Sequence, residues 1–137
     1  MALRVDLTFD CAAAEPLAEF WKLALGYEVE PPPAPFATRD EWAASFGEPE
    51  EDEGGGAWLR DPAGVGPRLS FLEVPEPKVA KNRMHLDVRV GRSDDQWTRI
   101  LAKADELVAA GGRVLHTFEG HHVTMSDPEG NEFCVAP

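Results

Sequence analysis

The sequence has few cysteines, few basic side chains and no long apolar run, and each shortage excludes a class of protein. Its two cysteines, Cys11 and Cys134, provide neither a disulfide-rich scaffold nor a C-x-x-C metal motif. Its 25 acidic and 13 basic side chains give a net charge of −12, which repels phosphates and anionic lipids. No apolar run approaches the ~20 residues that cross a bilayer. We therefore expect two reduced thiols and neither a nucleic-acid nor a membrane partner.

The length and the first residues indicate one cytoplasmic domain. The chain has 137 residues, and a hydrophobic content of 43% is enough to fill one core. A strand-like alternation follows Met1 directly, so we expect no signal peptide. We predict a single domain over residues 1–137.

Hydrophobic periodicity divides the chain into two similar modules, residues 1–77 and 80–137. In the first module the pattern predicts strands at 3–10, 27–30, 57–60 and 68–74, and a helix at 14–25. In the second module it predicts a strand through Val90, a helix that begins at a Ser93 cap and ends at Gly111, and strands at 113–118, 121–126 and 131–136. The turn Asp-Pro-Ala-Gly at 61–64 recurs as Asp-Pro-Glu-Gly at 127–130. This internal duplication predicts an α+β fold of two tandem βαβββ modules, whose curved antiparallel or mixed sheets enclose a cleft.

The first module carries an insertion at residues 31–56. Its prolines forbid regular structure, residues 40–46 suit one helical turn, and residues 48–56 read as a mobile loop. Phe36, Trp42 and Phe46 form an aromatic group inside it. Two interpretations remain open: a lid over the cleft, or a cap on the core beside the first helix. Trp42 and Trp58 could stack on a planar or cationic ligand, or could simply pack.

The stretch Met84-His85-Leu86-Asp87-Val88 places an imidazole and a carboxylate on the polar side of a strand. One interpretation is a general base, His85, with Asp87 as its partner. The other is a hydrogen-bonded polar pair without catalytic use. By the same alternation, a group of further polar residues should share the cleft with this pair: Asp6, Thr8, Ser70, Glu132 and Cys134.

Three stretches carry a resemblance to a known superfamily. They are Ala-Glu-Phe-Trp-Lys-Leu-Ala-Leu-Gly-Tyr (18–27), Lys-Asn-Arg-Met-His-Leu-Asp-Val (81–88) and Asp-Pro-Glu-Gly-Asn-Glu-Phe-Cys-Val (127–135). With this order of elements, the chain resembles the vicinal oxygen chelate superfamily, which includes glyoxalase I, extradiol dioxygenases and bleomycin-resistance proteins. The last two stretches resemble glyoxalase-like domains in particular. The resemblance implies the fold, but not one chemistry, because this superfamily hosts unrelated activities.

The resemblance also implies where a metal would lie. Metal-dependent members place one ligand on the first strand and one on the fourth strand of each module. Those positions are occupied here by Asp6, Leu72, His85 and Cys134. Leucine cannot bind a metal, although Glu132 could substitute as a ligand. We therefore expect no resident metal, with a divalent ion such as zinc or nickel as the alternative.

Two functions follow as expectations. The first is a bleomycin-resistance-like protein with a degraded metal site, which binds a drug or metabolite in the cleft. The second is a glyoxalase-like lyase or isomerase, in which His85 is the general base and Asp87 or Glu132 is its partner. The expected ligand-binding residues are Asp6, Thr8, Ser70, Leu72, Cys134, Trp42 and Trp58. The resemblance further implies a homodimer.

Overall fold

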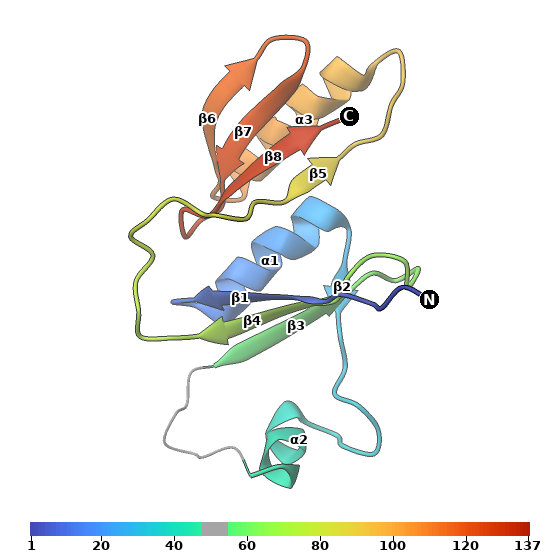
Figure 1. Cartoon of the computed structure of the whole chain (residues 1–137), viewed down its shortest axis with the longest axis vertical. Helices are drawn as coiled ribbons and strands as arrows, with labels where there is room; N and C mark the ends of the chain where they lie inside the picture. Colours follow the sequence, from blue (N-terminus) through green and yellow to red (C-terminus); the bar gives the residue numbers. More distant parts are fainter. Residues whose placement is uncertain (48–54) are drawn as a thin grey trace.

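The computed structural model describes residues 1–47 and 55–137, and its strands form two four-stranded sheets (Figure 1). The first sheet has the order β1-β4-β3-β2, with β1 at Leu7–Cys11, β2 at Glu28–Val29, β3 at Gly56–Arg60 and β4 at Leu69–Glu73. The second sheet has the order β5-β8-β7-β6, with β5 at Asp87–Arg89, β6 at Arg113–Phe118, β7 at His122–Ser126 and β8 at Glu132–Ala136. The helices are α1 at Ala14–Leu25, α2 at Arg39–Ser45 and α3 at Gln96–Ala109.

The two sheets repeat one topology. The first strand of each module runs parallel to the last, so β1 pairs with β4 and β5 pairs with β8. The other pairings are antiparallel. Leaving aside α2, which lies in the insertion between β2 and β3, each module has the order βαβββ. The predicted α+β fold of two tandem βαβββ modules is confirmed, although the two sheets do not close on one another.

Helix α1 forms where its apolar spacing predicts, from Ala14 to Leu25. Leu17, Trp21 and Ala24 share one face and are almost completely buried. Gly26 ends the helix in the left-handed conformation, at φ 68°, which a residue without a Cβ adopts at little cost.

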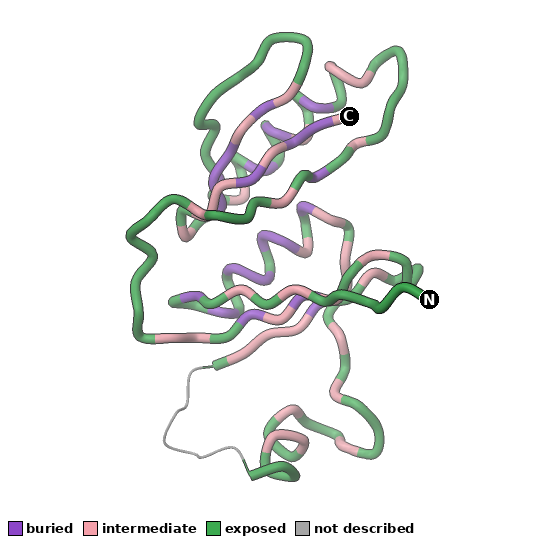
Figure 2. The backbone as a smooth tube through the Cα atoms, in the orientation of Figure 1, coloured by how far each residue is buried: buried purple, intermediate pink, exposed green. Residues whose placement is uncertain are grey.

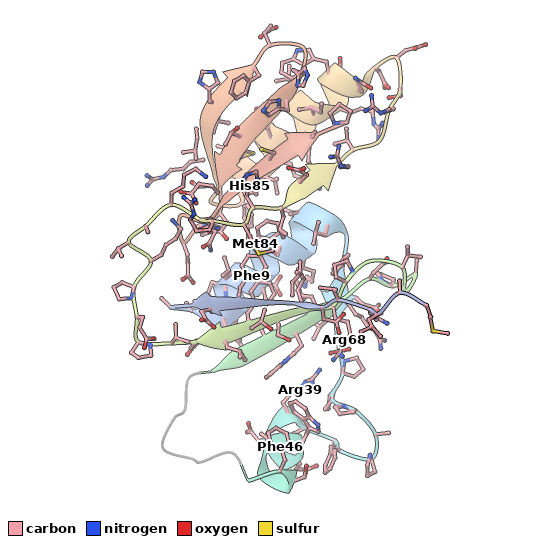
Figure 3. All side chains as sticks on the ribbon, in the orientation of Figure 1. Phe9, Arg39, Phe46, Arg68, Met84 and His85 are labelled. Carbon is pink, nitrogen blue, oxygen red and sulfur yellow. The ribbon has the colours of Figure 1, made fainter. Side chains whose placement is uncertain are left out.

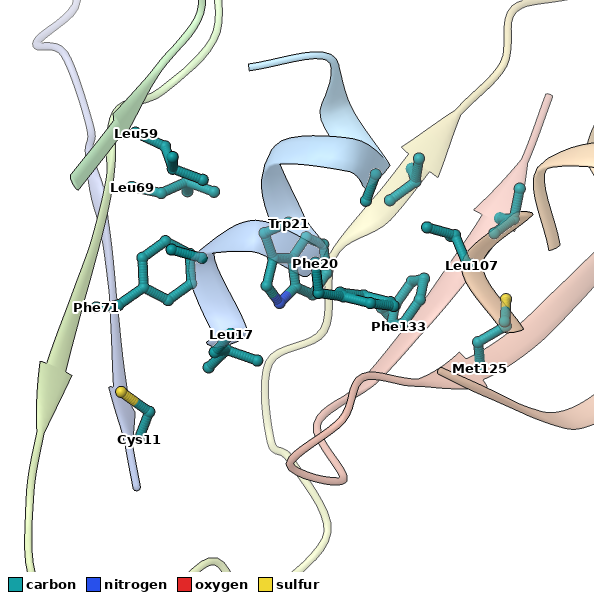
Figure 4. Packing of buried hydrophobic residues seen from close by; sticks show 14 of the residues in the cluster. Cys11, Leu17, Phe20, Trp21, Leu59, Leu69, Phe71, Leu107, Met125 and Phe133 are labelled. Carbon is teal, nitrogen blue, oxygen red and sulfur yellow. The ribbon is translucent and has the colours of Figure 1, made fainter. Parts of the chain in front are cut away.

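The buried face of α1 packs against both sheets (Figure 4). The Trp21 ring lies 5.3 Å from the ring of Phe9 on β1 and 5.0 Å from the ring of Phe133 on β8. Phe20 makes an edge contact with Phe133 at 5.9 Å. The indole N–H of Trp21 donates to Asp127 Oδ2 at 3.0 Å in a buried hydrogen bond. One helix therefore connects the cores of the two modules.

The entry into α1 is also held by the second module. Glu129, in the turn between β7 and β8, accepts hydrogen bonds from the backbone N–H groups of Ala12 at 2.6 Å and Ala13 at 3.1 Å. Glu73 on β4 accepts from the N–H of Ala14 at 3.1 Å. These carboxylates bind the free donors of the first turn and suit its positive dipole end.

Several predicted boundaries were wrong. The strand expected at 3–10 begins only at Leu7, and the apolar Leu3 and Val5 before it are 90% and 69% exposed, so they gain little from pairing. In the second module pairing begins at Asp87, and Met84, expected on the apolar side, is 78% exposed.

The cap expected at Ser93 was also wrong, since α3 begins at Gln96 and its N-cap is Asp95. The Ser93 hydroxyl instead donates to Asp95 Oδ1 at 2.6 Å. Most of the loop expected at 48–56 lies outside the described residues.

Each sheet has one helix-covered face and one face turned away from its helix, which we call the open face. Figure 2 shows the buried residues concentrated along α1, β7 and β8, whereas β6 is exposed along its length. No helix formed by the described residues combines the length and the apolar character that crossing a bilayer requires.

Candidate functional site

The open face of the second sheet gathers an imidazole, a carboxylate and a thiol. The parallel register of β5 and β8 places Asp87 beside Cys134, and the next register places Thr124 of β7 beside Cys134. His85, labelled in Figure 3, precedes Asp87 by two residues, just ahead of β5. One ligand atom from each of His85, Asp87 and Cys134 lies within 4.8 Å of the others. We call these three residues the polar cluster.

The polar cluster is open to solvent and only partly engaged with other groups. His85 and Asp87 are exposed, and Cys134 is half-buried. Asp87 forms an ion pair with Arg89 at 3.4 Å, and the Thr124 hydroxyl lies 3.8 Å from Cys134 Sγ. An imidazole beside a carboxylate can accept and return a proton, and all three groups can bind a cation.

Glu132 lies on the same strand face as Cys134 but has another role. Its carboxylate accepts from the backbone N–H of Asn82 at 2.9 Å and from Lys78 Nζ at 3.4 Å. The hydrogen bond from Asn82 is the main reason that the pKa of Glu132 lies below its usual value. The carboxylate holds the linker between the modules, and the structure places Asp87, rather than Glu132, beside His85.

The remaining predicted residues lie on the first sheet. Thr8, Ser70 and Trp58 form one row across β1, β4 and β3, and Leu72 lies in the next row, 41% exposed. Asp6 precedes β1 and accepts from the backbone N–H of Arg68 at 3.1 Å. That hydrogen bond is the main reason that the pKa of Asp6 is lowered.

Sequence reasoning missed an arginine that joins the insertion to this open face. The Arg39 guanidinium of α2 lies 4.4 Å from the centre of the Trp58 ring and 5.2 Å from that of Trp42. It also pairs with Glu30 at 2.9 Å, and Arg68 pairs with the same carboxylate at 2.5 Å. Burial raises the pKa of Glu30, but hydrogen bonds from Arg68 and Arg39 outweigh it, so the pKa is lowered. The spacing of Arg39 and Trp42, three residues apart on a helix, was the available signal.

The predicted site residues therefore fall into two groups rather than one. Helix α1 lies between the first sheet and the second module, and Arg39 and Arg68 lie on the side of the first sheet away from α1 (Figures 1 and 3). Within one chain the two open faces do not face each other. A pocket of about 370 Å³ lies elsewhere, and its lining includes none of the predicted site residues. The pocket is lined by Arg4, Val5, Leu7, Gly64, Val65, Gly66 and Pro67.

The four-residue metal set of the resembling superfamily does not fit this chain. Leu72 has no donor atom, and Asp6 is held by Arg68 on the first sheet. The second module supplies the two other positions, His85 and Cys134, and adds Asp87 beside them.

Two helix-covered βαβββ modules with polar open faces define a member of the vicinal oxygen chelate superfamily, as predicted. A family model described as "Glyoxalase-like domain" matches residues 6–136, and the chain belongs to that family. No curated protein matches the sequence.

Solved structures with the same fold support this assignment. The fosfomycin resistance protein FosX from Listeria monocytogenes superposes with a TM-score of 0.65 at 11% identity, over 99% of this chain and 91% of that chain. A glyoxalase/bleomycin resistance protein/dioxygenase family enzyme from Burkholderia phytofirmans PsJN gives 0.64 at 11% identity, over 97% of each chain. A possible glyoxalase from Bacillus cereus gives 0.63 at 15% identity, over 99% of this chain and 100% of that chain. At these identities the likeness shows the fold alone.

Proposed function

We propose that this glyoxalase-like protein binds a small molecule on the open faces of its sheets, with the polar cluster as one wall of the site. The observation that carries the proposal is the convergence of His85, Asp87 and Cys134 on one solvent-accessible face. Ligand sites usually include a few convergent polar groups that fix the orientation of the ligand. Thr8, Ser70 and Trp58 provide the corresponding face of the first sheet.

A homodimer would complete this site. Because α1 separates the two open faces within one chain, neither face alone encloses a ligand (Figure 1). In a two-fold dimer, the first sheet of one copy can lie opposite the second sheet of its partner. We expect sedimentation at micromolar concentration to show a dimer, and a monomer would contradict this part of the proposal.

A thermal-shift screen tests ligand binding. Metabolites and antibiotics, with bleomycin and fosfomycin among them, are added to the wild type and to His85→Gln. A true ligand stabilises the wild type by about 2.7 kcal/mol at a hundredfold excess over its Kd. We expect the shift to shrink in His85→Gln and to persist in His121→Gln, whose ring lies in the turn between β6 and β7. Equal shifts in all three proteins would contradict a site at the polar cluster.

A second candidate function is a lyase or isomerase with His85 as general base. The position of Asp87 beside the imidazole favours it, because a carboxylate can orient a histidine and stabilise its charged form. In that case a substrate found by the screen is turned over with a sigmoidal or bell-shaped pH–rate profile. Asp87→Asn should then lower kcat more than it changes KM. Saturable binding without turnover would contradict this enzyme function and would support the binding function.

A further inference from the structure

We infer that the turn between β6 and β7 forms a site for a copper(II) or nickel(II) ion from His121 and His122. The Nδ1 atoms of the two rings lie 2.9 Å apart. The turn lies at the end of the second sheet that is far from the first module and from His85 (Figures 1 and 3). The inference is therefore independent of the polar cluster and of the proposed function.

The backbone of the turn brings two neighbouring imidazoles together. Successive side chains of a strand point to opposite faces, so adjacent histidines on a strand diverge. Here β7 begins only at His122, and His121 belongs to the turn. The backbone N–H of His121 donates to the carbonyl of Phe118 at 2.8 Å, and Gly120 supplies the positive φ of 75°. The alternation is broken at this point, and the two rings converge.

The ring of His122 is also held by its neighbour across the hairpin. Phe118 pairs with His122, and their rings are stacked with centroids 4.4 Å apart at an interplanar angle of 18°. His116 contacts the same phenylalanine at 4.3 Å, but within the described part of the chain it forms no three-donor group with the pair. A ring that is already held loses less freedom on binding, so the two histidines are a preorganised chelate.

The separation of the two nitrogen atoms selects the kind of metal. With bonds of about 2.0 Å, two ligands at a right angle lie roughly 2.8 Å apart, whereas tetrahedral zinc needs about 3.3 Å. Right angles occur in the square-planar and tetragonal sites of copper(II) and nickel(II), which imidazole suits. The observed 2.9 Å fits the right angle. Water completes the coordination, and the net charge of −12 favours a cation.

The metal takes the place of the proton that the two rings share. A hydrogen bond between the Nδ1 atoms requires one ring to donate and the other to accept. When the ion binds, the donor ring carries its proton on Nε2 instead of Nδ1. Both Nδ1 lone pairs then reach the ion, both rings stay neutral, and no net proton is released.

The test is a calorimetric titration of the chelator-treated full-length chain with nickel(II). His121→Asn and His122→Asn should each weaken binding at least about tenfold, since even the outer-shell partners of metal ligands are worth 10–100-fold. His116→Asn is the matched control and should bind as the wild type does. Copper(II) is added to Cys134→Ser, because a thiolate would select copper(I). We expect nitrogen coupling in its electron paramagnetic resonance spectrum, which His122→Asn in the same background should reduce.

Several results would overturn the inference. Equal nickel binding in the wild type, His121→Asn and His122→Asn would show an adventitious ion only, and no binding at all would show no site. Loss of nickel binding in Cys134→Ser would place the ion at the polar cluster. Zinc binding more tightly than nickel would contradict the right-angle geometry. Circular dichroism of each variant separates a lost ligand from lost folding.

Discussion

Two aspartates at corresponding turns show how burial changes the role of the same residue type. Asp61 and Asp127 both begin an Asp-Pro-x-Gly turn. Asp61 accepts three backbone N–H groups within its own loop, and the pKa of Asp61 is lowered mainly by the bond from Gly66. Asp127 is 2% exposed and accepts from Glu129, Asn131 and the Trp21 indole. The second turn thereby became an anchor for α1.

Asp127→Ala should destabilise the chain by about 3 kcal/mol, because it leaves several buried donors without an acceptor. Urea unfolding of the variant and the wild type measures the difference. Asp61→Ala is the matched control, since it breaks the same turn at a more exposed place without a tryptophan partner. We expect a smaller loss there. Equal losses would show that the contact with Trp21 adds nothing.

Glu30 makes the stability of the chain depend on pH. Its side chain is 12% exposed and pairs with both Arg39 and Arg68. Although burial raises the pKa of this carboxyl, the arginine hydrogen bonds lower it overall. A lowered pKa in the folded state gives stability that is present above the ordinary pKa of 4.5 and is lost as the pH falls through the folded-state pKa.

Replacing Glu30 by Gln should therefore flatten the decline in stability below about pH 4.5. The measurement is the free energy of unfolding from pH 7 to pH 3. Glu28→Gln is the control, because Glu28 forms a half-exposed pair with Arg60 and should leave most of the decline in place. If the free energy of unfolding of Glu30→Gln falls below pH 4.5 as steeply as that of the wild type, Glu30 is not the group that causes the decline.

At the scale of elements, α2 contacts the first sheet through two side chains, Arg39 and Trp42, which both reach Trp58. None of its residues is buried, and Thr38 caps it by accepting from the N–H of Glu41 at 3.1 Å. Arg39 reaches across to Trp58, while Trp42 and Phe46 contact each other at 4.9 Å. Helix α2 therefore lies over the open face of the first sheet, where a lid would lie.

Arg39→Ala should loosen α2, because it removes the Arg39 contacts with Trp58 and Glu30 and leaves the edge contact of Trp42 with Trp58. A partly buried cation–π contact of ~1–2 kcal/mol corresponds to roughly tenfold faster amide hydrogen exchange in Arg39–Ser45. Arg60→Ala is the control, because Arg60 also pairs with a glutamate but at the exposed end of β3. If exchange in α2 stays the same in Arg39→Ala, other contacts hold the insertion.

The elements that could be predicted were those whose own spacing defines them. The helix at 14–25 and the strand at 113–118 agree with the structure to the residue. The alternation at Met84 failed because exposure there depends on what covers the strand. The proximity of Asp87 and Cys134 needed the register of β5 against β8, which no local pattern contains. The same holds for Arg39 on Trp58 and for Glu129 at the start of α1.

At the scale of the whole molecule, α1 makes the two modules one structure. Trp21, 1% exposed, contacts Phe9 in the first sheet and Phe133 in the second. Neither sheet alone can cover the whole Trp21 ring. We therefore expect the chain to unfold in one cooperative transition rather than module by module.

Native-state hydrogen exchange tests this coupling. Trp21→Ala should cost about 4 kcal/mol and lower the protection of the most stable amides in both sheets by the same free energy. Met125→Ala is the sharper variant, because Met125 is fully buried on β7, within the second module, and its loss should cost about 3 kcal/mol. If α1 couples the modules, Met125→Ala also lowers protection in β4 of the first sheet. Lost protection confined to β7 and β8 would show two independent modules, and α1 would then be a contact rather than a shared core.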